Sequence, residues 1–293
     1  MAVTREQPVK DYPASWQEQG FLTLPAFYGA DEVARVDNVV KRVWTNKTSS
    51  VVVDNLISRR RSRVADLSDE ERRQPFKVND LFLDFEEIRR ISLKEEMVRI
   101  LTSLLGEPPV LVNTLNLEKS SQQAAHVDAL YMTPHTPNHL VATWIALEDG
   151  HPDAGPLFYY PGSHKIPLYT FSNGSYHALS EEMRAWSEYI ESQIASRNLP
   201  KTYFHPRKGD AFIWHANLVH GGGQITNPTL TRKSLVSHFF SLPDMRAMGL
   251  DIAPLGPGFW WRRDPQPVPE PPRQGWSLGG LAQRVVRRLR GAS

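Results

Sequence analysis

The feature that most limits the fold is a change of pattern near residue 108, after which the chain breaks into short β-prone runs. Each run is rich in β-branched and aromatic residues and is bounded by Pro, Gly, Asn or Asp. The runs are 110–117, 123–128, 140–147, 156–160, 210–214, 217–221 and 233–241. A series of short strands is typical of a β-sandwich or barrel rather than a parallel sheet. We therefore expect a mainly β fold with peripheral helices.

Helical periodicity comes before these runs. A short strand within 20–28 is followed by an amphipathic helix from about Asp31, and a second apolar stripe over 94–105 stops at Gly106. These patterns predict a helical N-terminal support over about 15–108.

Two further segments lie outside the strand pattern. Residues 58–73 hold an arginine cluster with little apolar periodicity, which favours a loop followed by a solvated helix. An amphipathic pattern after the fourth run predicts a helical insertion over about 176–197.

The C-terminal end has a different composition. Five of the ten residues from Asp264 to Arg273 are proline, which indicates a stiff, extended segment. Leu278–Arg290 predicts a short basic amphipathic helix, expected to dock on its own domain rather than on a membrane. We expect one domain over 1–245 and a proline-rich arm over 246–293.

Composition excludes several classes of partner and site. With 34 basic and 32 acidic side chains the formal net charge is +2, too weak to favour nucleic acid. The absence of cysteine excludes disulfides, iron–sulfur clusters and thiolate metal sites, so nitrogen and oxygen must bind any metal. No apolar run is long enough for stable membrane insertion, and the start lacks a signal-like core. A cytoplasmic protein with a small-molecule substrate is the expectation, and the oligomeric state is not indicated.

One pair of residues has metal-ligand spacing. His126 and Asp128 are two residues apart, so on a strand both side chains would leave the same face while Val127 faces away. Two histidines and one carboxylate on one face of an octahedral ion leave three positions open, as in Fe(II) oxygenases. Taken alone, His-x-Asp is also compatible with a surface pair.

A second motif supplies the missing ligand. The segment 209–223 reads as a turn, a strand and then His220 beside three glycines, which allow close approach of backbone to a ligand. His215 competes for the role, but five residues separate the two, so on a regular strand they face opposite ways. We favour His220. Arg232, which opens the last run, could hold a dicarboxylate through a bidentate pair.

Together these segments resemble the phytanoyl-CoA dioxygenase family of 2-oxoglutarate oxygenases. The resemblance rests on His126 to Asp128 and on Gly209 through Phe239, with linking motifs between them and a similar N-terminal opening. The linking motifs are Trp144 to Asp149, Gly155 to Leu157 and Pro161 to Lys165, and the opening is Gly20 to Pro25. In blocks, the resemblance covers roughly residues 18–242.

The resemblance implies a fold and a set of site residues. The fold is a double-stranded β-helix, a jelly-roll barrel with helices outside. His126, Asp128 and His220 become ligands of Fe(II), Arg232 binds the distal carboxylate of 2-oxoglutarate, and Trp144 lies near that cosubstrate. Dioxygen is the second cosubstrate.

One departure from the family pattern concerns this cosubstrate. Many relatives carry serine two residues after the distal histidine, where this chain has Gly222. Either that contact is weakened, or Thr143, Asn113 or Gln123 replaces it. Tyr131 and Met132, just beyond Asp128, are candidates for the substrate pocket, although such a pair is also common in cores.

The implied activity is hydroxylation of an aliphatic carbon in a small organic molecule, with release of succinate and CO2. Desaturation, cyclisation and epimerisation begin with the same hydrogen abstraction and remain open. A metal-dependent hydrolase could use the same ligands on zinc but would have no use for Arg232. A non-catalytic metal-binding module would normally have lost a ligand.

Overall fold

The computed structural model describes residues 12–269, and its centre is a large, mostly antiparallel sheet. Along one path of neighbours the strands are β1 (Phe21–Leu24), β9 (Ala211–His215), β6 (Leu140–Ala146), β11 (Ser234–Ser241), β5 (Pro109–Leu117), β4 (Phe76–Asn79), β2 (Val52–Asn55) and β3 (Arg61–Arg63). A hairpin of β12 (Ile252–Leu255) and β13 (Gly258–Trp261) joins this sheet, because β13 pairs in parallel with β5.

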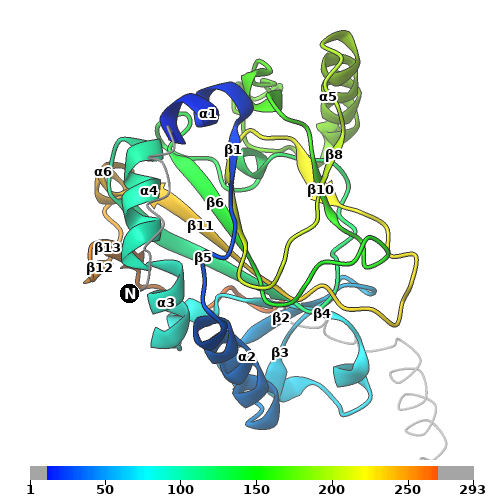
Figure 1. Cartoon of the computed structure of the whole chain (residues 1–293), viewed down its shortest axis with the longest axis vertical. Coiled ribbons are helices and arrows are strands. Elements are labelled where there is room, and N and C mark those ends of the chain that lie inside the picture. The colour runs from blue at the N-terminus through cyan, green and yellow to red at the C-terminus, as the bar shows by residue number, and fades with distance from the viewer. Residues whose placement is uncertain (1–11, 270–293) are drawn as a thin grey trace, which may run out of the picture.

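A second, three-stranded sheet faces the centre of the first, as Figure 1 shows. Its order is β10 (His220–Gly222), β7 (Leu157–Tyr159) and β8 (Thr202–Phe204). A single bridge between His126 and His220 adds the chain segment before Asp128 to the free edge of β10. Two sheets whose strands alternate along the chain in this way form a double-stranded β-helix, so the predicted fold is confirmed.

Along the central strands, successive side chains point to opposite faces of the main sheet and so contribute to two separate cores. Trp144 on β6 and Trp214 on β9 face the space between the two sheets, where they pack with other apolar side chains. Ile145 and Ile213 point the other way, into a larger core beneath the helices. Because both faces of the main sheet are covered, its central strands are apolar almost throughout rather than alternating with polar residues.

Helices cover the face of the main sheet that points away from the second sheet (Figure 1). They are α1 (Tyr12–Gln19), α2 (Ala30–Thr45), α3 (Glu86–Ser92) and α4 (Glu95–Leu105). Helix α2 buries a stripe of valines, and the Glu32 carboxylate accepts a hydrogen bond from the Gly29 amide at its N-terminus. Helix α4 ends at Gly106, whose φ of 74° is the left-handed conformation that glycine adopts readily. Both helices confirm the periodicity.

The remaining helices lie apart from this layer. Helix α5 (Met183–Ser196), preceded by a 3-10 turn at Ser180–Glu182, confirms the predicted insertion. Helix α6 (Leu242–Ala247) follows β11 directly and begins with Ser241, whose hydroxyl accepts from the Asp244 amide. No helix within residues 12–269 is long and apolar enough to cross a membrane.

Three expectations about local structure were wrong. Residues 58–73 hold strand β3 and two 3-10 turns, Val64–Asp66 and Glu71–Arg73, instead of a solvated helix. Only the bridge at His126 remains of the strand expected over 123–128. Strand β10 begins at His220, three residues later than the run 217–221 indicated. In each case backbone pairing with a distant segment decides the structure, and periodicity within the segment carries no information about that pairing.

The C-terminal segment is part of the main sheet as far as the structure describes it. The domain boundary expected at 245 falls inside α6, and the β12–β13 hairpin beyond it pairs with β5. The predicted basic helix over Leu278–Arg290 lies outside the described residues.

Candidate metal and cosubstrate site

The two candidate metal-binding histidines face each other across a pair of reciprocal backbone hydrogen bonds. The His126 amide donates to the His220 carbonyl at 2.9 Å, and the His220 amide donates back at 3.0 Å. After Val127 the chain turns into a 3-10 helix, Asp128–Leu130, which places the Asp128 carboxylate beside both rings. The strand geometry assumed from the sequence is therefore replaced by a bridge and a turn, with the same convergence of side chains.

The three side chains present their ligand atoms to one point. Nε2 of His126 lies 3.8 Å and Nε2 of His220 lies 3.7 Å from Oδ1 of Asp128. The ligand atoms of all three lie within 4.8 Å of one another, and all three residues are buried. Two imidazoles and one carboxylate on one side of a point are the donor set of non-haem Fe(II) sites, so the residues fit that ion.

Backbone carbonyls hold the orientation of both rings. Nδ1 of His126 is 2.9 Å from the Ala124 carbonyl, and Nδ1 of His220 is 2.9 Å from the Leu218 carbonyl. A carbonyl only accepts, so each Nδ1 carries the proton and each Nε2 keeps its lone pair for a metal.

The electrostatics of the cluster favour the forms that bind metal. Burial, together with the neighbouring His220, lowers the pKa of His126 to about 4, so this ring is neutral at pH 7. Burial alone would raise the pKa of Asp128, but the imidazoles of His220 and His238 outweigh it, and the pKa of this carboxyl lies well below its usual range. A neutral imidazole beside an ionised carboxylate can bind a cation without first losing a proton.

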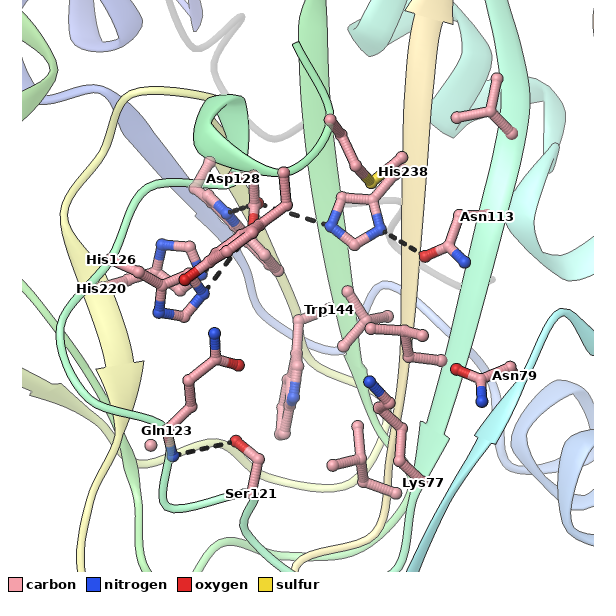
Figure 2. A pocket seen from close by; sticks show the side chains of 18 of the residues that line it. Lys77, Asn79, Asn113, Ser121, Gln123, His126, Asp128, Trp144, His220 and His238 are labelled. Atoms are coloured by element: carbon pink, nitrogen blue, oxygen red, sulfur yellow. Dashed lines mark hydrogen bonds and ion pairs between the residues drawn. The ribbon is translucent and has the colours of Figure 1, made fainter. Parts of the chain in front are cut away.

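Two side chains that the sequence analysis missed hold the other oxygen of Asp128. Trp214 donates from Nε1 to Oδ2 at 2.7 Å. Nε2 of His238 lies 3.4 Å from the same oxygen (Figure 2). The alternation of side chains along this segment could have identified His238, because it has the same parity as Arg232. The pocket is lined by Arg232, Val236, His238 and Phe240. His215 faces the other side of β9 and packs against the rings of Trp16 and His164, so it is not a ligand. The single regular strand assumed for His215 and His220 is absent, because His215 ends β9 and His220 begins β10 in the second sheet.

Arg232 lies in the same pocket with much of its hydrogen-bonding capacity unused. It is 7% exposed, its Nε and Nη1 atoms have no partner, and its guanidinium carbon is 5.9 Å from the Trp144 ring centre. Burial lowers the pKa of Arg232 to about 10, so the group stays charged at pH 7. A buried cation with free, planar donors fits a carboxylate such as the distal group of 2-oxoglutarate.

The pocket has a volume of about 560 Å³, within the roughly 300–1,000 Å³ of small-molecule sites. Asn113, Gln123, Tyr131 and Met132, all singled out from the sequence, line it. Thr143 does not: it lies on β6 between Val141 and Ile145, which face the helix-side core, and opposite in parity to Trp144. The suggestion that Thr143 contacts 2-oxoglutarate is therefore wrong, because alternate residues of a strand face opposite sides.

Polar groups from β3 and β4 complete the wall. Arg61 on β3 belongs to the arginine cluster noted in the sequence, whereas no sequence pattern indicated the β4 residues. Lys77 projects into the pocket in Figure 2, with Asn79 two residues further along the same strand. Both polar side-chain atoms of Asn79 are buried without a partner. Nζ of Lys77 lies 3.1 Å from Oδ2 of Asp54, and Nε of Arg61 lies 2.7 Å from Oδ1 of the same carboxylate. These two cations and one anion give this group a net charge of +1.

Close packing explains the glycines after His220. A Cβ on Gly221 would lie 2.5 Å from Cζ of Phe158 and 2.8 Å from the Gln123 carbonyl. A Cβ on Gly222 would lie 2.8 Å from Oγ of Ser120. The Ser120 hydroxyl and the Gln122 backbone therefore occupy the space that a side chain at position 222 would need.

Comparison with known proteins gives matches over most of the chain. A family model described as phytanoyl-CoA dioxygenase (PhyH) matches residues 16–234. The peroxisomal phytanoyl-CoA dioxygenase of Mus musculus is 24% identical over 237 residues, which is 77% of this chain and 66% of the mouse protein. The chain thus spans just under two thirds of that relative's length.

Solved structures share the fold. The non-heme alpha ketoglutarate dependent carbocyclase SnoK from nogalamycin biosynthesis superposes with a TM-score of 0.59 at 18% identity, covering 91% of this chain and 96% of SnoK. The corresponding epimerase SnoN gives 0.58 at 21% identity, covering 86% of this chain and 97% of SnoN. At these identities the likeness concerns the fold.

Proposed function

Since the chain belongs to the phytanoyl-CoA dioxygenase family of iron- and 2-oxoglutarate-dependent oxygenases, we propose that it hydroxylates an aliphatic carbon of a small, largely apolar molecule. One observation carries the proposal: three convergent metal-ligand atoms and an unpartnered buried arginine line the same pocket. A hydrolytic metal site would leave that arginine without a role.

Four charged or metal-binding side chains of the pocket have a role in this proposal. His126, Asp128 and His220 hold the iron, and Arg232 binds the distal carboxylate of 2-oxoglutarate. When bound, iron, 2-oxoglutarate and dioxygen supply the oxidising power for an unactivated carbon–hydrogen bond, with succinate and CO2 as co-products. Trp144 packs beside Arg232 and keeps water from its guanidinium, which strengthens the pairing with a carboxylate.

The substrate occupies the apolar part of the pocket. Met132, Phe240, Val112 and Trp261 line it, and Tyr131 lies beside the iron site with its ring centre 6.0 Å from that of His126. Apolar walls bind a hydrocarbon body and exclude water from the reacting carbon. Gln123 and the Ser121 hydroxyl, which also line the pocket, are the groups we propose beside 2-oxoglutarate in place of the missing serine.

Anaerobic titration with Fe(II) and 2-oxoglutarate tests the cofactor assignment. We expect the wild type to give the weak visible metal-to-ligand charge-transfer band of an iron-chelated 2-oxoglutarate. Arg232→Met should need far more 2-oxoglutarate, and Asp128→Ala should give no band. His151→Ala, which alters an exposed histidine, is the matched control and should titrate like the wild type. Folded, iron-loaded wild type without a band would contradict the proposal.

The reaction outcome is tested separately with isotopically labelled dioxygen. Hydroxylation incorporates one labelled oxygen atom into the product, whereas desaturation, cyclisation and epimerisation leave the product without it. We screen apolar small molecules for 2-oxoglutarate consumption and then analyse the products by mass spectrometry. A turned-over substrate without label would replace hydroxylation with one of the other outcomes.

A further inference from the structure

The C-terminal segment reaches the active-site pocket. Strand β13 pairs with β5 at Val110 and Leu111, and the chain beyond it places Arg263 and Gln266 in the pocket wall. These residues lie after the last residue matched by the family model, residue 234. The segment is therefore part of the site in this chain.

Arg263 forms an ion pair there with the buried carboxylate of Asp80. Its Nη2 donates to Oδ2 of Asp80 at 2.8 Å and to the Val112 carbonyl at 3.2 Å, and the two side chains are 15% and 3% exposed. Within residues 12–269, no other cation lies within ion-pair distance of Asp80. Removing one partner of such a pair leaves an uncompensated buried charge.

Asp80 in turn fixes the side-chain amide of Asn113. Its Oδ1 accepts from Nδ2 of Asn113 at 2.7 Å and from the Thr114 amide at 3.2 Å. Because a carboxylate only accepts, the NH2 group of Asn113 must face Asp80, and its oxygen must face away.

That oxygen orients His238. Oδ1 of Asn113 lies 3.0 Å from Nδ1 of His238, so Nδ1 donates to it, and Nε2 lies 3.4 Å from Oδ2 of Asp128 (Figure 2). Both neighbours are acceptors, and an imidazole with a proton on each nitrogen donates to both of them. His238 is 4% exposed and comes from β11, whereas Asp128 follows the bridge at His126. Arg263 and three buried side chains, Asp80, Asn113 and His238, thus connect the C-terminal segment to a metal-binding carboxylate.

We propose that Arg263 is a positioning residue for the metal site, which holds the Asp128 carboxylate in place through Asp80, Asn113 and His238. This inference rests on the proposed function, because it takes Asp128 as an iron ligand. Loss of outer hydrogen-bond partners typically weakens metal binding by about 10- to 100-fold. Because three side chains separate Arg263 from Asp128, we expect a loss of iron affinity near the lower end of this range.

The test measures Fe(II) binding by anaerobic equilibrium dialysis of the full chain. Arg263→Gln should weaken iron binding on the order of 10-fold. The affinity of the iron-saturated protein for 2-oxoglutarate should stay unchanged, because Arg232 is intact. Arg262→Gln is the matched control, since its guanidinium pairs with Asp251 at the surface, and it should bind iron like the wild type.

Arg263→Lys is the second variant and a partial rescue. Its charge still compensates Asp80 and so preserves folding, but it lacks the planar fork and should bind iron with an affinity between those of wild type and Arg263→Gln. Either variant that folds and binds iron as the wild type does overturns the proposal.

A double-mutant cycle distinguishes the route from a general structural effect. In a His238→Phe background the contacts through Asp80 and Asn113 no longer reach Asp128, so Arg263→Gln should no longer change iron affinity. The same loss in both backgrounds overturns the proposed route. A wild type that does not bind Fe(II) would instead overturn the proposed function, so the two failures are distinguishable.

Discussion

Replacement of Arg232 by methionine should stabilise the ligand-free protein while nearly abolishing 2-oxoglutarate binding. The residue is buried, two of its donor atoms have no partner, and burial lowers its pKa to about 10. A free guanidinium has a pKa of roughly 12.5 or above, and each pKa unit corresponds to about 1.4 kcal/mol. The folded state therefore disfavours this cation by ~3 kcal/mol at every pH below its pKa.

Methionine fills similar space without the charge. The gain in the free energy of unfolding should be about 1–3 kcal/mol, since replacement of buried charges by apolar residues is stabilising by amounts of this order. Two charge-assisted hydrogen bonds to a carboxylate contribute roughly 1.5–3 kcal/mol each, so the dissociation constant of 2-oxoglutarate should rise by at least about 100-fold.

Urea unfolding without ligands measures the first effect, and thermal unfolding with and without 2-oxoglutarate and Fe(II) measures the second. The wild type should be stabilised by the ligand, because a ligand that binds only the folded state shifts the unfolding equilibrium. Arg232→Lys, which keeps a charge, should show neither the gain nor full binding. The reasoning is refuted if ligand-free Arg232→Met is less stable than wild type and still responds to 2-oxoglutarate.

Three further substitutions test the roles assigned to residues in and near the site. The pKa of His215 is lowered to about 3, mainly by burial and secondly by the nearby His164. As the pH falls below about 6.5, the residue therefore takes up a proton in the unfolded state but stays neutral in the folded state. Stability should therefore drop between about pH 6.5 and 3, and urea unfolding of His215→Gln should show a pH slope shallower by up to ~1.4 kcal/mol per pH unit. Gly222→Ser should lower the free energy of unfolding by about 1–3 kcal/mol in urea, because its Cβ meets Ser120, and unchanged stability would contradict the packing argument. Thr143→Val should leave the 2-oxoglutarate dissociation constant unchanged in the iron titration, and a large increase would place Thr143 in the site after all.

Local patterns predicted the parts of the fold that depend on residues near one another in sequence. Helices α2 and α4 follow from apolar periodicity and from Gly106, and the longest strands, β5 and β11, follow from β-branched runs. Strand β2 has only the short valine run 51–53, and β3 and β4 carry no comparable signal. They exist because β4 pairs with β5, and that pairing joins residues about forty positions apart.

The same limit applies to the site. His126, Asp128 and His220 were identified because spacing and neighbouring glycines mark them, and Arg232 because it opens a strand. Lys77 and Arg263 come from segments whose places in the sheet could not be predicted, and His238 lies in a run that read as ordinary core. Alternation from Arg232 could have placed His238 on the pocket face, but nothing in the sequence shows that Asn113 faces it.

The distribution of unused hydrogen-bonding groups gives a physical reason to regard the pocket as built for polar ligands. Within residues 12–269, nine buried side-chain atoms lack a partner, and five of them belong to the pocket residues Asn79, Arg232 and Arg263. Each such group costs about 1–3 kcal/mol when it stays unpaired. A core selected for stability alone would not concentrate these costs in one pocket, so the cost falls where a bound carboxylate or substrate can relieve it. Ligand binding and folding are then linked, and the wild type should gain more stability from 2-oxoglutarate with iron than from either alone.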